Sequence, residues 1–161
     1  MNPAACWVGF FFGFAPALAT AQDTGASIER GRYLVTIAGC NDCHTEGYAD
    51  AKGEIPEGEW LKGSSLGFCG PWGTSYALNL RLYVPPMSED DWVAYARNYI
   101  HLAWRPMPGY AVAKMEEADL RSLHQFIVSL GEAGRPAPYR TPAGMPPSTP
   151  VVVFPGCKTP N

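Results

Sequence analysis

Two cysteines and a histidine fall within five residues of this 161-residue chain, and they constrain its fold more than any other feature. The segment reads Cys40-Asn41-Asp42-Cys43-His44. Residues three apart on a helical turn lie on the same side, so both thiols can face one partner. The imidazole follows directly after the second thiol. The chain must therefore fold around whatever these three side chains hold.

This spacing matches the attachment motif of a c-type haem, in which both thiols form thioethers with the porphyrin and the imidazole binds the iron. We expect one haem c, covalently bound through Cys40 and Cys43, with His44 as an axial ligand. Two alternatives stay open. A structural zinc site needs four ligands, but no second Cys or His pair follows at close spacing. A redox dithiol of thioredoxin type would follow a strand, whereas a predicted helix precedes this motif.

The second axial ligand is expected to be a methionine, the usual partner in electron carriers because a thioether raises the reduction potential. We favour Met107, which lies in a loop between two predicted helices. Its neighbours Pro106 and Pro108 restrict the loop backbone. The other candidates are less well placed, at helix starts, on helices or in the C-terminal tail: Met87, Met115, Met145, His101 and His124.

The first residues of the chain form a separate segment. Residues 6–18 are apolar, no charged side chain precedes Asp23, and small residues follow near position 21. The apolar run is too short to cross a bilayer, which takes roughly 20 residues, and is typical of a secretory signal. We expect residues 1–21 to be a signal peptide, with an uncleaved anchor as the alternative. The mature chain would be periplasmic, with no stable membrane span.

Hydrophobic periodicity predicts three main helices in the mature chain. The first runs over residues 28–38, the second begins after Ser88 as its N-cap, and the third covers about residues 115–130. Gly131 is the predicted stop of the third helix.

The rest of the mature chain shows no helical pattern. Residues 45–87 have no sustained period and are rich in Gly and Pro, which predicts loop with one short helical turn. Eight prolines follow Gly131 and exclude helix and central strand, although residues 151–154 form a strand-like run. We therefore expect a domain over residues 22–131 and an extended proline-rich tail over residues 132–161.

With these elements the chain resembles class I cytochrome c, and in particular the exported single-haem cytochromes and cytochrome subunits that serve bacterial dehydrogenases. The likeness covers roughly residues 28–155. It is carried by the segments RGRYLVTIAGCNDCHT, GPWGTSYALNL, SEDDWVAYARN, RPMPGY and ADLRSLHQFIVSLG, and by TPVVVF in the tail.

The resemblance implies an all-α cytochrome c fold, with three main helices around one haem, long Gly/Pro-rich loops and the extended tail. The N- and C-terminal helices would cross, bringing Gly31 and Tyr33 against Leu123, Phe126 and Ile127. The chain departs from the family at residues 81–86, where relatives usually carry a Thr-Pro-Asp type of loop. Three residues near this departure are therefore given no role: Trp72, Tyr76 and Arg81.

The resemblance also implies an electron carrier rather than an enzyme. The protein would shuttle one electron between a dehydrogenase and a downstream cytochrome or oxidase. The alternatives are a cytochrome subunit docked on a dehydrogenase, and a five-coordinate haem peroxidase or sensor. A formal net charge of −3 argues against nucleic-acid partners, which require a clustered basic surface.

Two cysteines remain once the haem takes residues 40 and 43 and the signal removes Cys6. An even remainder in an oxidising compartment predicts a disulfide between Cys69 and Cys157. Two free thiols are the alternative.

Overall fold

The computed structural model describes residues 26–99 and 105–158, so the predicted signal segment and His101 lie outside the described residues. In chain order the elements are α1 (Ile28–Ile37), α2 (Cys40–His44), the 3-10 helix η1 (Glu57–Glu59), β1 (Gly67–Gly70), β2 (Gly73–Tyr76), α3 (Leu80–Tyr83), α4 (Glu89–Asn98), α5 (Gly109–Val112), α6 (Glu117–Ser129) and β3 (Val151–Val153). The three longest helices, α1, α4 and α6, correspond to the three predicted from periodicity. None of the helices in the described ranges is both long and apolar enough to cross a membrane.

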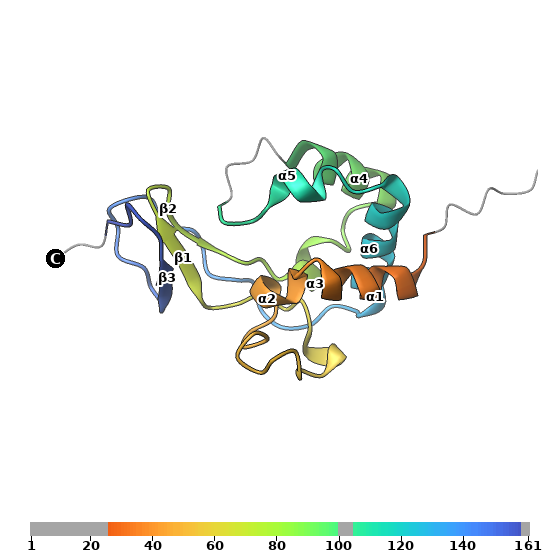
Figure 1. Cartoon of the computed structure of the whole chain (residues 1–161), viewed down its shortest axis with the longest axis horizontal. Coiled ribbons are helices and arrows are strands. Elements are labelled where there is room, and N and C mark those ends of the chain that lie inside the picture. Colours follow the sequence, from red (N-terminus) through yellow and green to blue (C-terminus); the bar gives the residue numbers. More distant parts are fainter. Residues whose placement is uncertain (1–25, 100–104, 159–161) are drawn as a thin grey trace, which may run out of the picture.

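Helices α1 and α6 pack against each other, as the sequence predicted (Figure 1). The two helices approach each other closely at Gly31. A Cβ atom at this position would lie 2.1 Å from the carbonyl oxygen of Ser122 and 2.6 Å from Cβ of Phe126. Tyr33, by contrast, is 52% exposed and lies beneath the guanidinium of Arg30, so its predicted place in the crossing is wrong.

The hydrophobic core lies where α1, α4 and α6 meet. Trp92 of α4 is buried there, and its indole N–H donates a hydrogen bond of 2.8 Å to the carbonyl of Leu120 in α6. The N-terminus of α4 is capped by Ser88, whose hydroxyl accepts from the amide of Asp91. The buried core residues are Leu34, Val35, Leu61, Val84, Trp92, Ala96, Leu120, Leu123, Phe126 and Ile127.

A three-stranded sheet makes the fold mixed α and β, and the predicted all-α class is wrong. Strand β1 pairs antiparallel with β2 and parallel with β3, in the order β2-β1-β3. The sheet lies at the end of the molecule remote from the α1–α6 crossing (Figure 1). The strands have only three or four residues, and glycines occupy three of the hairpin positions. A period of two cannot be recognised over so few residues, so the hairpin was predicted to be loop.

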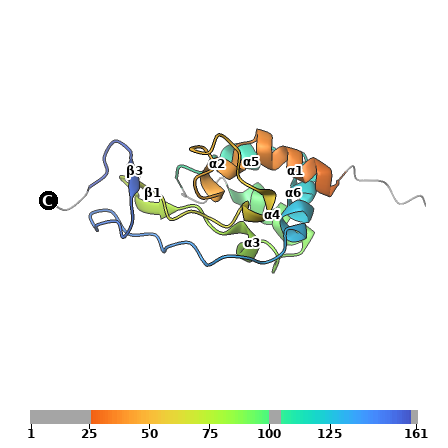
Figure 2. The ribbon, with the colours of Figure 1, turned by 90° about the horizontal axis from the view of Figure 1, so that it is seen from below.

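The proline-rich tail returns to the body instead of leaving it. Figure 2 shows it running from α6 along the molecule to the sheet. The side-chain amide of Asn79 donates to the carbonyls of Ala133 and Arg135, at 2.8 and 3.1 Å. Thr74 and Thr141 then exchange two backbone hydrogen bonds of 2.9 Å. The tail is extended, as predicted, and it completes the sheet.

A disulfide between Cys69 and Cys157 fastens the end of the tail to β1. Of the two alternatives left by the sequence, the structure has the bridge rather than two free thiols. The bridge closes a loop with a sequence separation of 88 residues. By the chain-entropy estimate, a loop of this length makes the bridge worth about 4–5 kcal/mol.

Arg81, to which the sequence assigned no role, fixes the end of α6. Its guanidinium is buried and donates to the carbonyl of Gly131 at 2.6 Å and to that of Gly58 at 2.7 Å, and a third bond goes to the carbonyl of Leu130. A cation at a helix C-terminus also interacts favourably with the helix dipole. Arg81 is therefore a structural residue.

Replacing Gly31 with alanine is expected to lower the free energy of unfolding by about 1–3 kcal/mol, the usual cost of overpacking a well-packed site. The loss should appear even though alanine is the better helix former by roughly 1 kcal/mol. Urea unfolding followed by circular dichroism measures it. Gly58→Ala is the matched control, because no atom lies within 4 Å of a Cβ built there. Equal stability of the two variants would contradict the close helix contact.

Candidate functional site

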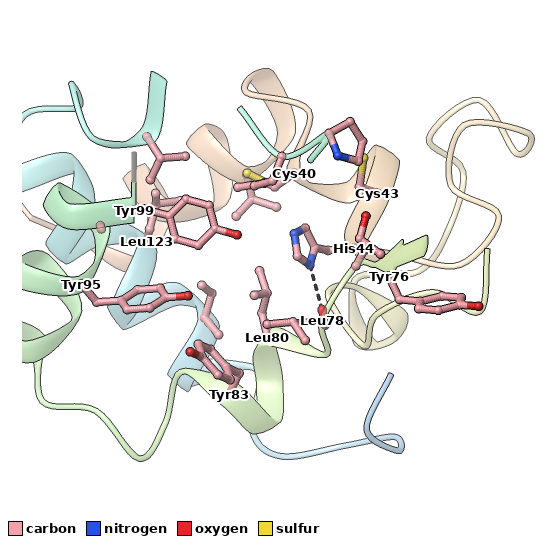
Figure 3. A pocket seen from close by; sticks show the side chains of 18 of the residues that line it. Cys40, Cys43, His44, Tyr76, Leu78, Leu80, Tyr83, Tyr95, Tyr99 and Leu123 are labelled. Atoms are coloured by element: carbon pink, nitrogen blue, oxygen red, sulfur yellow. Dashed lines mark hydrogen bonds between the residues drawn. The ribbon is translucent and has the colours of Figure 1, made fainter. Parts of the chain in front are cut away.

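An apolar pocket lies between the helices and the sheet (Figure 3). Its empty space, counted together with the open mouth, is about 1070 Å³. Its walls come from α1–α3, the β1–β2 hairpin and the segment after it, α4–α6 and the loop that contains Met107. The described lining residues are Val35, Cys40, Cys43, His44, Phe68, Ser75, Tyr76, Ala77, Leu78, Leu80, Tyr83, Trp92, Tyr95, Ala96, Tyr99, Arg105, Pro106, Met107, Val112, Met115, Leu123 and Ile127.

The five-residue helix α2 presents the predicted motif to this pocket. Gly39 adopts a left-handed conformation, with a φ of 68°, and turns the chain between α1 and α2. Cys40, Cys43 and His44 all line the pocket, and neither cysteine takes part in a disulfide. The structure thus brings the three side chains to one cavity, as the spacing predicted.

A backbone hydrogen bond fixes the orientation of the His44 ring. Its Nδ1 lies 2.7 Å from the carbonyl oxygen of Leu78, in the segment that follows β2 (Figure 3). A carbonyl only accepts, so Nδ1 carries the proton and Nε2 keeps a lone pair. Burial lowers the pKa of His44, an effect that the bond to Leu78 opposes, so the ring is neutral at neutral pH. No sequence pattern predicts this partner, because a backbone atom of an ordinary leucine supplies it.

The two thiols are partly shielded from water. Burial raises the pKa of Cys40 to about 11, and burial together with the charge of Asp42 also raises the pKa of Cys43. Redox dithiols of thioredoxin type have thiol pKa values that are lowered instead. The environment of the pair therefore argues against the dithiol alternative.

A zinc site also finds little support. Across residues 26–99 and 105–158, no three side chains of the His, Cys, Asp and Glu types gather closely enough to hold a metal ion. A structural zinc ion takes four such ligands. The motif cysteines and His44 thus gain no further ligand of this kind from the described part of the chain.

Met107 lines the same pocket as the motif, although it lies far away in the sequence. Met115 lines it too, and also packs against the hydrophobic core. Met87 packs against the core away from the pocket, and Met145 is 54% exposed in the tail. The structure therefore narrows the methionine candidates to two, of which Met107 is on the loop.

His124 is a buried residue of α6 and is not part of the pocket lining. It is buried, and its Nε2 lies 2.9 Å from the carbonyl oxygen of Met87. Because that carbonyl accepts, Nε2 carries the proton and is engaged. This arrangement argues against His124 as a ligand.

Two tyrosines, one in α4 and one directly after it, reach the pocket without having been singled out as site residues from the sequence. Tyr95 and Tyr99 lie one helical turn apart, their ring centroids are 5.5 Å apart, and their hydroxyls point toward the cavity (Figure 3). Burial raises the pKa of Tyr99 to about 12, and it also raises that of Tyr95. Both hydroxyls therefore stay protonated and can donate hydrogen bonds. Their i, i+4 spacing was the only signal available in the sequence.

The hairpin residues left without a role from the sequence have structural partners. The Trp72 indole donates to the carbonyl of Phe68 at 3.2 Å, and its ring packs against that of Phe154, with centroids 5.6 Å apart. Tyr76 lines the pocket, while its hydroxyl accepts a hydrogen bond of 3.2 Å from Thr149 in the tail.

Comparison with protein families, curated proteins and solved structures finds no match to this chain. The resemblance to class I cytochrome c therefore rests on the attachment motif, the methionine loop and the helix crossing.

The residues of the pocket fit a covalently bound haem. They offer two thiols that no other group uses, an imidazole with its Nε2 lone pair available, and a thioether from a distant loop. The remaining walls are largely aliphatic and aromatic, as a porphyrin requires.

The hydrogen bonds of the two buried histidines lead to opposite expected tautomers. His44 should carry its proton on Nδ1 and His124 on Nε2, because each of these atoms faces a backbone carbonyl. Long-range ¹H–¹⁵N correlation spectra of the purified protein at mildly alkaline pH can distinguish the two tautomers. Each histidine ring is the control for the other. A His44 ring protonated on Nε2 would contradict the described site.

Proposed function

We propose that this protein is a periplasmic electron carrier that holds one haem c and passes single electrons between a dehydrogenase and a downstream acceptor. One observation carries the proposal. The attachment motif and Met107, which are remote in the sequence, line a single apolar pocket.

Each residue of the pocket has a defined task in this proposal. Cys40 and Cys43 would form the thioether bonds to the haem, and His44 Nε2 and Met107 Sδ would bind its iron. When bound, the haem supplies a one-electron Fe(III)/Fe(II) couple. The carbonyl of Leu78 holds the His44 ring in one orientation and one tautomer. Such a partner is usual for a metal-binding histidine and raises the basicity of its free nitrogen.

The environment of these residues suits electron transfer. Apolar side chains line most of the site and limit the access of water, and the proposed ligands come from a helix and from a loop that prolines restrict. Two ligands held in place limit the rearrangement that accompanies a change of charge. The task requires no catalytic acid, base or nucleophile.

Secretion of the chain together with a c-type cytochrome maturation system is expected to give a coloured protein with the mass of one added haem. The pyridine haemochrome spectrum should be that of a haem with two thioethers. The Cys40→Ala/Cys43→Ala variant should lose the covalent haem. Cys69→Ala/Cys157→Ala is the matched control and should keep it. A colourless wild-type protein with the mass of the bare polypeptide would refute the proposal.

Met107→Ala is expected to remove the long-wavelength band of methionine–iron(III) ligation and to lower the midpoint potential by on the order of 0.1 V or more, since a thioether ligand favours Fe(II). Absorption spectra and a redox titration measure both effects. Met115→Leu is the control, because this methionine lines the same pocket; its spectrum should stay that of the wild type.

Two outcomes would contradict this ligand assignment. Loss of the band in Met115→Leu alone would transfer the role to Met115. A wild-type protein without the band that binds carbon monoxide rapidly when reduced would instead support the five-coordinate peroxidase or sensor.

A further inference from the structure

We propose that Ser75 is a positioning residue that holds the methionine loop, residues 105–108, over the pocket, and that the sheet fastened by the Cys69–Cys157 disulfide braces it. This inference rests on the proposed function, because it concerns the loop of the proposed ligand Met107.

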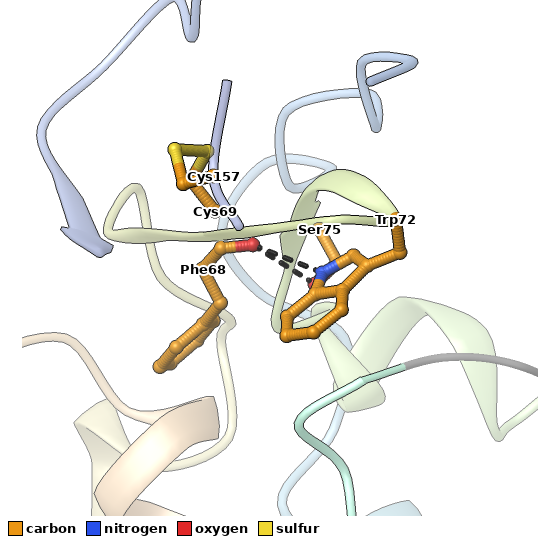
Figure 4. Close-up of a disulfide and its surroundings, with 5 residues drawn as sticks. All are labelled: Phe68, Cys69, Trp72, Ser75 and Cys157. Carbon is orange, nitrogen blue, oxygen red and sulfur yellow. Dashed lines mark hydrogen bonds between the residues drawn. A yellow bond between two sulfur atoms is a disulfide. The ribbon is translucent and has the colours of Figure 1, made fainter. Parts of the chain in front are cut away.

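The link between sheet and loop is one side-chain hydroxyl. Ser75 lies in β2, is buried, and donates a hydrogen bond to the backbone carbonyl of Arg105, two residues before Met107. Phe68 is the residue of β1 that pairs with Ser75. Its carbonyl oxygen lies farther from the Ser75 hydroxyl, at 3.5 Å (Figure 4). A hydroxyl has a single proton to donate, so the nearer Arg105 carbonyl receives it.

The other end of the loop is held by α5 and α4. The amide of Gly109 donates a 2.9 Å hydrogen bond to the carbonyl of Met107, and α5 starts at this glycine. A Cβ atom at position 109 would lie 2.3 Å from Cδ1 of Tyr99, so the start of α5 lies directly against the residue that caps the C-terminus of α4. With Pro106 and Pro108 restricting the backbone between these anchors, the location of Met107 depends on where Ser75 is held.

The sheet is a firm support for Ser75 because the tail fixes both of its sides. On one side, Thr74 exchanges two backbone hydrogen bonds of 2.9 Å with Thr141. On the other side, β3 pairs with β1 and the disulfide joins Cys69 to Cys157.

Aromatic packing adds to this support. The ring of Phe154 packs against those of Phe68 and Trp72, with centroids 6.5 and 5.6 Å apart. Figure 4 shows Phe68, the disulfide, Trp72 and Ser75 together on the hairpin. The tail thus acts on the methionine loop through the strand that carries Ser75.

The inference is tested by competition for the place of Met107. Imidazole is titrated into the oxidised, haem-loaded wild type and into Ser75→Ala. Removing the hydroxyl should free the loop and raise the apparent imidazole affinity roughly two- to tenfold, the range set by the net contribution of one hydrogen bond. Hydrogen exchange of a peptide covering residues 105–113 should become faster in the same variant.

Two variants separate positioning from general destabilisation. Ser75→Thr retains the hydroxyl and should restore the imidazole affinity and the slow exchange. Thr74→Val changes the neighbouring buried hydroxyl, which has no hydrogen-bond partner among the described residues, and should leave both measurements at their wild-type values. A Thr74→Val effect as large as that of Ser75→Ala would overturn the specific role of Ser75.

Unchanged imidazole affinity and unchanged exchange in Ser75→Ala would also overturn the inference, while leaving the haem proposal intact. A wild-type chain that takes up no haem would refute the proposed function instead. If Ser75→Ala is not recovered as folded protein, Cys69→Ala/Cys157→Ala provides the test. Removing the disulfide should loosen the sheet that supports Ser75 and so raise the apparent imidazole affinity. An unchanged imidazole affinity in that variant would refute the proposal that the disulfide-linked sheet supports the loop.

Discussion

The hydrogen bond from His44 Nδ1 to the carbonyl of Leu78 joins the helical part of the molecule to the segment that leaves the sheet. Helix α2 alone could present its side chains in many directions. This bond, and a second of 2.8 Å from the amide of Gly63 to the carbonyl of His44, fix α2 against the following chain. The motif and the segment after β2, which both line the pocket, are held at this separation.

Burial gives the pocket its chemical character. The thiols of Cys40 and Cys43 have raised pKa values and the imidazole of His44 a lowered one, so all three groups are neutral at neutral pH. Desolvation is the largest cause in each case, because a charged form is poorly solvated among apolar side chains. Three neutral, polarisable donors in an apolar cavity suit a flat hydrophobic cofactor better than a hydrated ion.

The sequence predicted the parts of the site that local spacing controls. The spacing of residues 40–44 predicts that two thiols and an imidazole face one partner. The prolines on both sides of Met107 distinguish it from the other methionines. The three long helices follow from periodicity, and the need for glycine at position 31 follows from their crossing. What could not be predicted depends on distant partners, such as the carbonyl of Leu78 and the hydroxyl of Ser75.

The sheet shows why the fold class was predicted wrongly. Residues 67–70 contain two glycines and are too short to display a period, and their parallel partner, β3, lies beyond the last helix. The β1–β2 hairpin alone would be only marginally stable, since an isolated two-stranded hairpin is marginal in water. The disulfide and the packing of Phe154 compensate for the small area of the sheet.

A proline-rich tail is well suited to stabilising the sheet. Ordering it costs little conformational entropy, and it cannot form a competing helix. The Asn79 side chain and Thr74 then fix where it runs. Residues that follow α6 therefore help to hold the strand of the pocket wall that carries Ser75.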